Sequence, residues 1–118
     1  MDFRTELVDC VRILSLSAFE QIGYLDSLKG DIDELALDFH DAYLMCSQML
    51  QRREITDESF AALTALDQQL TSMSGQERCQ LWTEDALYSS QEWVCVRSLA
   101  RNALGSLTAS LVELRSTQ

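Results

Sequence analysis

The chain has 118 residues, 19 of them acidic against 9 Lys or Arg, which gives a formal net charge of −10 at pH 7. This charge argues against nucleic-acid binding and against an anionic membrane surface, because both require a basic surface. A hydrophobic content of 47% is typical of a globular protein, and the absence of proline leaves few residues that disfavour helices. With the capping patterns and apolar periodicity given below, we expect an all-α protein in which residues 1–118 form a single compact bundle of five to six helices.

The N-terminal residues Met1-Asp2-Phe3-Arg4 lack the basic stretch and apolar run of a signal peptide. No segment approaches the ~18 apolar residues that a membrane span needs. We therefore expect a cytoplasmic protein. In that compartment cysteines are expected to be small buried side chains rather than disulfides. The chain has four of them: Cys10, Cys46, Cys79 and Cys95.

Capping patterns and apolar periodicity predict the first two helices. The first spans about residues 3–16, and its apolar face carries Leu7, Val11 and Leu14. The second spans about residues 18–29 and begins with the capping-box pattern Ser17-Ala-Phe-Glu20. Gly30 follows at the point where this helix should end.

A third helix is expected over about residues 32–53, after the Asp-led pattern Asp31-Ile-Asp-Glu34. A fourth is expected over about residues 58–73, because Thr56 can cap it and two acids follow in its first turn. The side chains of the third helix that should face the core are Leu35, Phe39, Ala42, Cys46 and Leu50.

The C-terminal part predicts a short helix over about residues 77–88, after Ser74-Gly-Gln-Glu77. The last helix is expected over about residues 91–115, after Ser89-Ser-Gln-Glu92. Its apolar residues repeat at three- and four-residue spacing: Trp93, Val96, Ala100, Leu104, Leu107, Leu111 and Leu114.

Residues that could support catalysis are scarce. His40 is the one histidine, and nothing in the sequence brings it next to a cysteine. Asp31-Ile-Asp-Glu34 resembles the start of a calcium loop, but Ala36 and Ala42 stand where an EF-hand needs glycine and glutamate. Neither a Glu-x-x-His pair nor a phosphate-binding glycine loop occurs. The sequence therefore predicts a non-enzymatic protein without metal or cofactor.

An acidic stripe on the third helix is the main candidate for partner binding. Asp31, Glu34, Asp38 and Asp41 fall within about one quarter of the helix circumference. Like charges at this spacing repel, and a basic partner would relieve that repulsion. The alternative interpretation is that the stripe is simply the solvated face of the helix.

Apolar residues add to this candidate surface. Leu37 and Leu44, with His40 between them, lie away from the predicted core face. They either pack against another helix or present apolar surface to a partner. Trp82 is a further candidate anchor, since tryptophan is frequent at interface centres, although it could equally close the core as Trp93 is expected to.

Arg97 and Arg101 are one helical turn apart beside the apolar face of the last helix. Across a groove they could form ion pairs with acids of the third helix, and such surface pairs contribute little to stability.

Three segments resemble the small, acidic, all-helical immunity proteins that are encoded beside secreted antibacterial toxins. They are Asp33-Glu-Leu-Ala-Leu-Asp-Phe-His-Asp-Ala-Tyr, Leu81-Trp-Thr-Glu-Asp-Ala-Leu and Glu92-Trp-Val-Cys-Val-Arg-Ser-Leu-Ala-Arg. The resemblance implies a bacterial cytoplasmic protein that binds a toxin domain with a basic cleft and blocks its active site. It assigns no functional residue, because immunity proteins share a task rather than a motif.

Two other functions stay open at this point. The chain could be a helical adaptor, chaperone or structural module, including a homodimer joined through Leu37 and Leu44. It could also be an enzyme that uses a carboxylate or cysteine site without a recognised motif.

Overall fold

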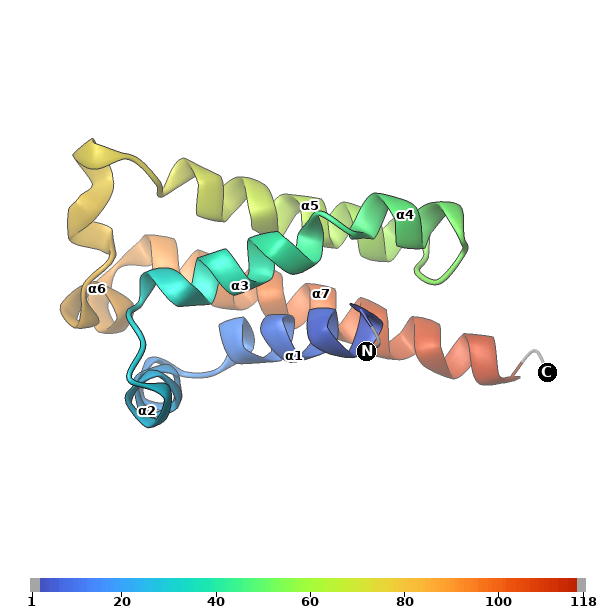
Figure 1. Ribbon diagram of the computed structural model, residues 1–118, viewed down its shortest axis with the longest axis horizontal. Coiled ribbons are helices and arrows are strands. Elements are labelled where there is room, and N and C mark those ends of the chain that lie inside the picture. The colour runs from blue at the N-terminus through green and yellow to red at the C-terminus, as the bar shows by residue number, and fades with distance from the viewer. Residues whose placement is uncertain (1–2, 117–118) are drawn as a thin grey trace.

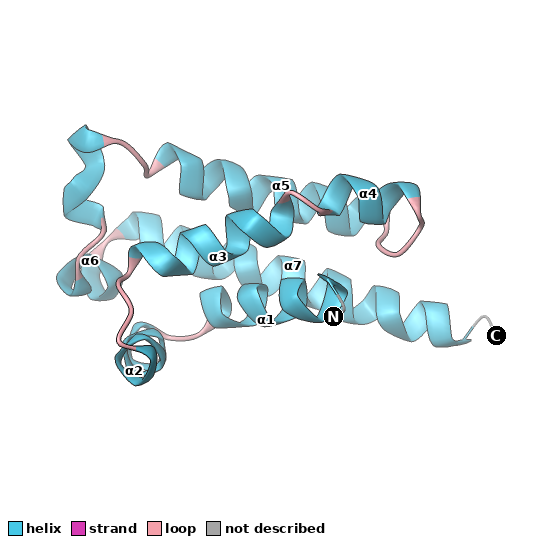
Figure 2. Ribbon diagram, viewed as in Figure 1, coloured by secondary structure: helices cyan, strands magenta, loops and turns pink. Residues whose placement is uncertain are grey.

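The structure is a computed structural model that describes the backbone of residues 3–116 and the side chains of residues 4–109. Within this range it contains seven α-helices and one short 3-10 helix, and no strand (Figures 1 and 2). The predicted all-α class is confirmed. The expected number of helices was too low, because two segments predicted as single helices are interrupted.

Four helices form the body of the protein: α1 (Phe3–Ser15), α3 (Asp33–Tyr43), α5 (Asp57–Ser72) and α7 (Gln91–Ser116). Helix α1 packs against α7 and α3, and α5 packs against the same two helices, so the four close into a ring. Successive members of the ring run in opposite directions along the long axis (Figure 1). This arrangement is an up-down-up-down four-helix bundle.

The remaining helices lie at the two ends of the bundle. Helix α2 (Ala18–Leu28), the 3-10 helix η1 (Gln76–Leu81) and α6 (Glu84–Ser89) lie together at one end (Figure 1). Helix α4 (Cys46–Gln51) lies at the other end and packs on α5. No helix in the described part of the chain is both long and apolar enough to cross a membrane.

The buried apolar side chains form one cluster, to which the four helices of the ring contribute most and the other helices add members such as Leu25, Met49 and Leu87. The apolar faces predicted for α1 and α7 point into it, although Leu104 is only partly buried and the side chains of Leu111 and Leu114 lie outside the described range. The largest fully buried members are Trp93, Phe39, Leu7, Leu14, Leu63 and Leu66. Burial of this apolar surface is the main stabilising contribution to the fold.

Two of the predicted helix caps are confirmed. Ser17 and Glu20 form the predicted capping box of α2. Thr56 caps α5 by accepting a hydrogen bond from the amide of Ser59 at 3.1 Å. Gly30 lies just beyond the end of α2, and Lys29 takes the left-handed conformation at that end.

The other three capping predictions are wrong. Helix α3 starts after Ile32 without any side-chain cap, so Asp31 does not cap it. The Ser74 hydroxyl instead donates to the carbonyl of Leu70 at 3.1 Å. At α7 the capping serine is Ser90, whose hydroxyl accepts from the amide of Trp93 at 3.2 Å, and Ser89 belongs to α6.

The predicted helix over residues 32–53 breaks at Leu44 and Met45, which separate α3 from α4. The amide of Met45 bonds to the carbonyl of Ala42, three residues back, at 3.2 Å. This tighter turn rotates the following helix, since a 3-10 step advances further around the axis than an α step. As a result Met49 is buried in α4, whereas Leu50 is only partly buried.

The predicted helix over residues 77–88 also breaks, at Trp82 and Thr83. Thr83 takes an extended conformation and its hydroxyl accepts from the amide of Ala86 at 3.1 Å, which starts α6 anew. The Trp82 indole N–H donates to the carbonyl of Met73 at 2.9 Å, and this contact ties the connection to the end of α5.

Gln21 fixes the corner between α1 and α2. Its side chain is fully buried, and its amide nitrogen donates to the carbonyls of Ile13 and Leu14, both at 3.1 Å. These two carbonyls belong to the last turn of α1, where carbonyls lack the usual partner four residues on. The carbonyl of Ile13 also accepts from the amide of Leu16 at 3.2 Å. The Gln21 side chain on α2 therefore caps the end of α1 and holds the angle between α1 and α2.

Gln21→Ala is expected to lower the free energy of unfolding by about 1–3 kcal/mol, because the buried carbonyl of Leu14 loses its Gln21 donor and the carbonyl of Ile13 keeps only the amide of Leu16. Urea denaturation followed by circular dichroism measures the change. Gln68→Ala on the exposed face of α5 is the matched control and should change stability by less than about 0.5 kcal/mol. Equal effects of the two substitutions would show that the hydrogen bonds of Gln21 contribute nothing to the free energy of unfolding.

Candidate binding groove

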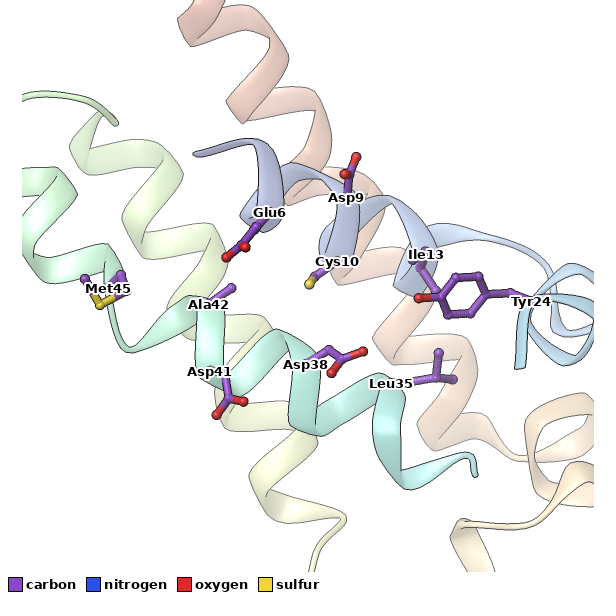
Figure 3. A pocket seen from close by; sticks show the side chains of 10 residues that line it. All are labelled: Glu6, Asp9, Cys10, Ile13, Tyr24, Leu35, Asp38, Asp41, Ala42 and Met45. Atoms are coloured by element: carbon purple, nitrogen blue, oxygen red, sulfur yellow. The ribbon is translucent and has the colours of Figure 1, made fainter. Parts of the chain in front are cut away.

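A groove of about 520 Å³ opens between α1 and α3, with α2 at one end (Figure 3). Its volume lies within the range of ~300–1,000 Å³ that is usual for ligand clefts. Four acidic side chains belong to its lining: Glu6, Asp9, Asp38 and Asp41. The other lining residues are largely apolar: Cys10, Ile13, Tyr24, Leu35, Ala42 and Met45.

The helical periodicity of α1 produces one wall of this groove. Leu7, Val11 and Leu14 turn into the bundle core and are fully buried. Cys10 and Ile13 lie beside that stripe and are only partly buried, so they face the groove. The apolar face of α1 is therefore wider than the stripe that the core covers. Its edge, formed by Cys10 and Ile13, is a partly exposed apolar surface.

The acidic side chains differ in direction. In Figure 3, Glu6 and the Cys10 thiol point from α1 towards α3, and Asp38 lies along the groove side of α3. Asp9 and Asp41 point away from the opposite helix. Glu6 and Asp38 are therefore the inner acids of the groove, and Asp9 and Asp41 are its outer acids.

The carboxylates make the groove strongly negative. Burial raises the pKa of the Cys10 thiol to about 11, and the negative charges of Asp38, Asp9, Glu6 and Asp41 add to this shift. Burial likewise raises the pKa of Tyr24, with Asp38 as the largest charge contribution. Two side chains from different helices therefore lie in the same negative field.

Little within the described residues neutralises this field. Asp9 pairs with Arg12 at 3.0 Å, but both side chains are more than half exposed, and such pairs contribute little. Glu6, Asp38 and Asp41 take part in none of the ion pairs formed among the side chains that the structure describes. The inner acids thus repel each other across an apolar floor.

The structure divides the acidic stripe that the sequence predicts. Asp38 and Asp41 line the groove, whereas Asp31 precedes α3 and lines a separate cavity of about 340 Å³ near α2. Glu34 is exposed, and its carboxylate lies beside Gly30. The four acids of the predicted stripe therefore do not share one cavity.

Leu37 and Leu44 are 59% and 60% exposed, so of the two alternatives for these leucines the structure shows exposure. Leu37 lines a third cavity of about 430 Å³ together with Trp82. His40 lies on the side of α3 that faces α5, where its Nδ1 is 3.2 Å from the Asp67 carboxylate.

Trp82 is chiefly a packing residue. Its ring meets the Trp93 ring edge to face, with 5.3 Å between centroids, and Trp93 is fully buried. Part of Trp82 still reaches the surface, since it lines the two smaller cavities. It is not part of the groove between α1 and α3.

Arg97 and Arg101 do not pair with acids of α3 within the described residues, which corrects the expectation from their spacing. The buried Arg97 guanidinium donates to the carbonyl of Leu87, and Arg101 Nε donates to the carbonyl of Ser15 at 3.2 Å. The physical reason is the helix order in the ring, in which α7 contacts α1 and α5 rather than α3.

The cysteines are all free thiols. Cys46 is buried and Cys10 partly buried, but Cys79 and Cys95 are exposed, contrary to the prediction that all are buried. Across the described residues, no group of three or more His, Cys, Asp or Glu side chains is arranged to hold a metal ion.

Sequence reasoning missed Glu6, Asp9, Cys10 and Tyr24 as members of this site. The available signal was the spacing of Glu6, Cys10 and Ile13 on one face of the first helix, next to its core face. That spacing shows which residues share a face, but not which helix that face opposes.

No protein-family model matches this chain, and neither the curated proteins nor the solved structures contain a significant match.

Proposed function

We propose that this protein is a non-enzymatic binding protein that covers a basic site on a protein partner with the acidic groove between α1 and α3. In its specific form, the protein is a cytoplasmic immunity protein of a bacterium. Its partner is then a toxin domain with a basic cleft, and binding neutralises the toxin by blocking its active site.

The observation that carries this proposal is the convergence of four carboxylates from two helices around an apolar floor. Apolar surface contributes affinity when a partner covers it, and complementary charge speeds the encounter and selects the partner. The overall charge of −10 extends the same attraction over the whole molecule.

The test is capture of partners from the native host with the tagged chain as bait, followed by titration of the captured protein. Asp38→Lys combined with Asp41→Lys should weaken binding at least about tenfold, as expected for the loss of close charge pairs. Glu58→Lys combined with Glu77→Lys makes the same change in net charge outside the groove and should leave most of the affinity.

Wild-type binding should also weaken as salt is raised, since salt screens exposed charges. Unchanged affinity and salt dependence in the groove variant would contradict the proposal. The immunity form makes a further demand: the captured protein must be toxic when expressed alone, and coexpression of this chain must restore growth. A partner whose activity the chain does not inhibit would contradict that form.

A second function is favoured by the exposure of Leu37 on α3 and of Leu44 directly after that helix. Two exposed leucines one heptad apart could join this chain to a second copy or to a client, as in an adaptor or chaperone. The molar mass from light scattering distinguishes the two functions: a dimer that Leu37→Asp converts to a monomer would favour the second.

A further inference from the structure

We propose that the groove between α1 and α3 is the seat of one arginine side chain of the partner, with its stem on the apolar floor and its guanidinium between Glu6 and Asp38. This inference rests on the proposed function and deepens it, because it names the chemical group that the site recognises.

The shape of the groove suits a side chain that is apolar along its length and charged at its tip. Ile13, Leu35 and Ala42 provide the apolar surface on facing helices. Long basic side chains place their methylene groups on such surfaces while the charged end remains in a polar environment. A purely apolar anchor would leave the carboxylates facing an uncharged group, and a bare cation would leave the floor exposed.

The carboxylates of the groove favour a positively charged occupant. The inner acids Glu6 and Asp38 come from different helices, and the outer acids Asp9 and Asp41 add to the same negative field. Burial is the main cause of the raised pKa of Cys10 on the groove floor, and the charges of all four acids add to it. A cation seated here would relieve repulsion that the isolated chain leaves in place.

Arginine fits better than lysine for two reasons. Its planar guanidinium is weakly hydrated and can donate to two carboxylates at once, whereas an ammonium is a compact, strongly hydrated charge.

The experiment uses N-propylguanidinium, which is the arginine side chain without its backbone, titrated into the ¹⁵N-labelled full chain. Saturable shifts are expected for amides of the groove, Cys10 and Ala42 among them, with a dissociation constant on the order of millimolar for so small a ligand. Guanidinium ion, which lacks the stem, and propylammonium, which lacks the planar head, should both bind more weakly.

Glu6→Gln combined with Asp38→Asn should reduce the affinity for N-propylguanidinium about tenfold or more, the loss expected for a charge-assisted hydrogen bond. Glu58→Gln combined with Glu77→Gln removes the same charge elsewhere and should change the affinity less than about twofold. Unchanged amide shifts outside the groove verify that each variant is folded.

Non-saturating shifts at all acidic residues, or unchanged affinity in the Glu6 and Asp38 variant, would overturn the inference. If the probe fails but the captured partner still depends on Asp38 and Asp41, the arginine seat is wrong and the proposed function stands. If the probe binds as expected but no protein partner is captured, the seat for a guanidinium stands and the proposed function fails.

Discussion

Trp93→Ala is expected to lower the free energy of unfolding by about 3–5 kcal/mol, which is the range for truncating a fully buried tryptophan. The Trp93 side chain has no exposed surface, and its indole N–H donates to the carbonyl of Leu81 at 2.6 Å. It also supports the ring of Trp82 through their edge-to-face contact. The substitution therefore leaves a cavity, an unpaired carbonyl and an unsupported neighbour.

A loss of this size is a large part of the ~5–15 kcal/mol by which domains are usually stable, so the variant should unfold at much lower urea concentration. Circular dichroism is the suitable signal, because the substitution removes one of the two tryptophans. Val94→Ala tests the neighbouring position, whose side chain is 51% exposed, and should cost less than about 0.5 kcal/mol. A loss below about 1 kcal/mol for Trp93→Ala would contradict its central place in the core.

Arg97→Ala is expected to cost about 2–4 kcal/mol for a different reason. The Arg97 guanidinium is buried without an acidic partner among the described residues, and its hydrogen bond goes to the carbonyl of Leu87 near the end of α6. Burial lowers the pKa of Arg97, and repulsion from Arg101 adds to the shift. Removal of the side chain leaves a buried carbonyl without a donor and also removes the packing of the long stem.

Arg97→Met separates these two contributions, because methionine restores most of the packing but none of the hydrogen bonding. It should lie between the wild type and Arg97→Ala in thermal and urea denaturation. Arg101→Ala, at an exposed position that also donates to a carbonyl, should cost less than about 1 kcal/mol. If Arg97→Met were as stable as the wild type, the hydrogen bond to Leu87 would be irrelevant to stability.

The helices themselves could be predicted because their causes are local. The capping box of Ser17 and Glu20 and the cap by Thr56 depend on residues three positions apart, so sequence alone contains them. The breaks after Tyr43 and Leu81 could not be predicted in the same way. Neither contains proline or glycine, and after the first break Met49 is buried in the core while Leu50, which the unbroken helix would bury, is only partly buried.

Only the acids that α3 contributes to the groove could be predicted from the sequence, for a related reason. Asp38 and Asp41 stood out as acids on one face of a helix, and the structure places both at the groove. Glu6 and Asp9 lie on a helix some thirty residues earlier, and only the packing of α1 against α3 brings them opposite. The same packing order takes Arg97 and Arg101 away from α3.

The sequence by itself thus determined the helical class, most helix starts, the core faces and the excess of negative charge, since periodicity and capping act within a few residues of the chain. The tertiary structure decided which faces meet. Helix pairing depends on the fit of whole apolar surfaces around one shared core, and no local pattern encodes it. That pairing placed four carboxylates around one apolar groove and left Leu37 and Leu44 exposed, and both features carry the functional proposals.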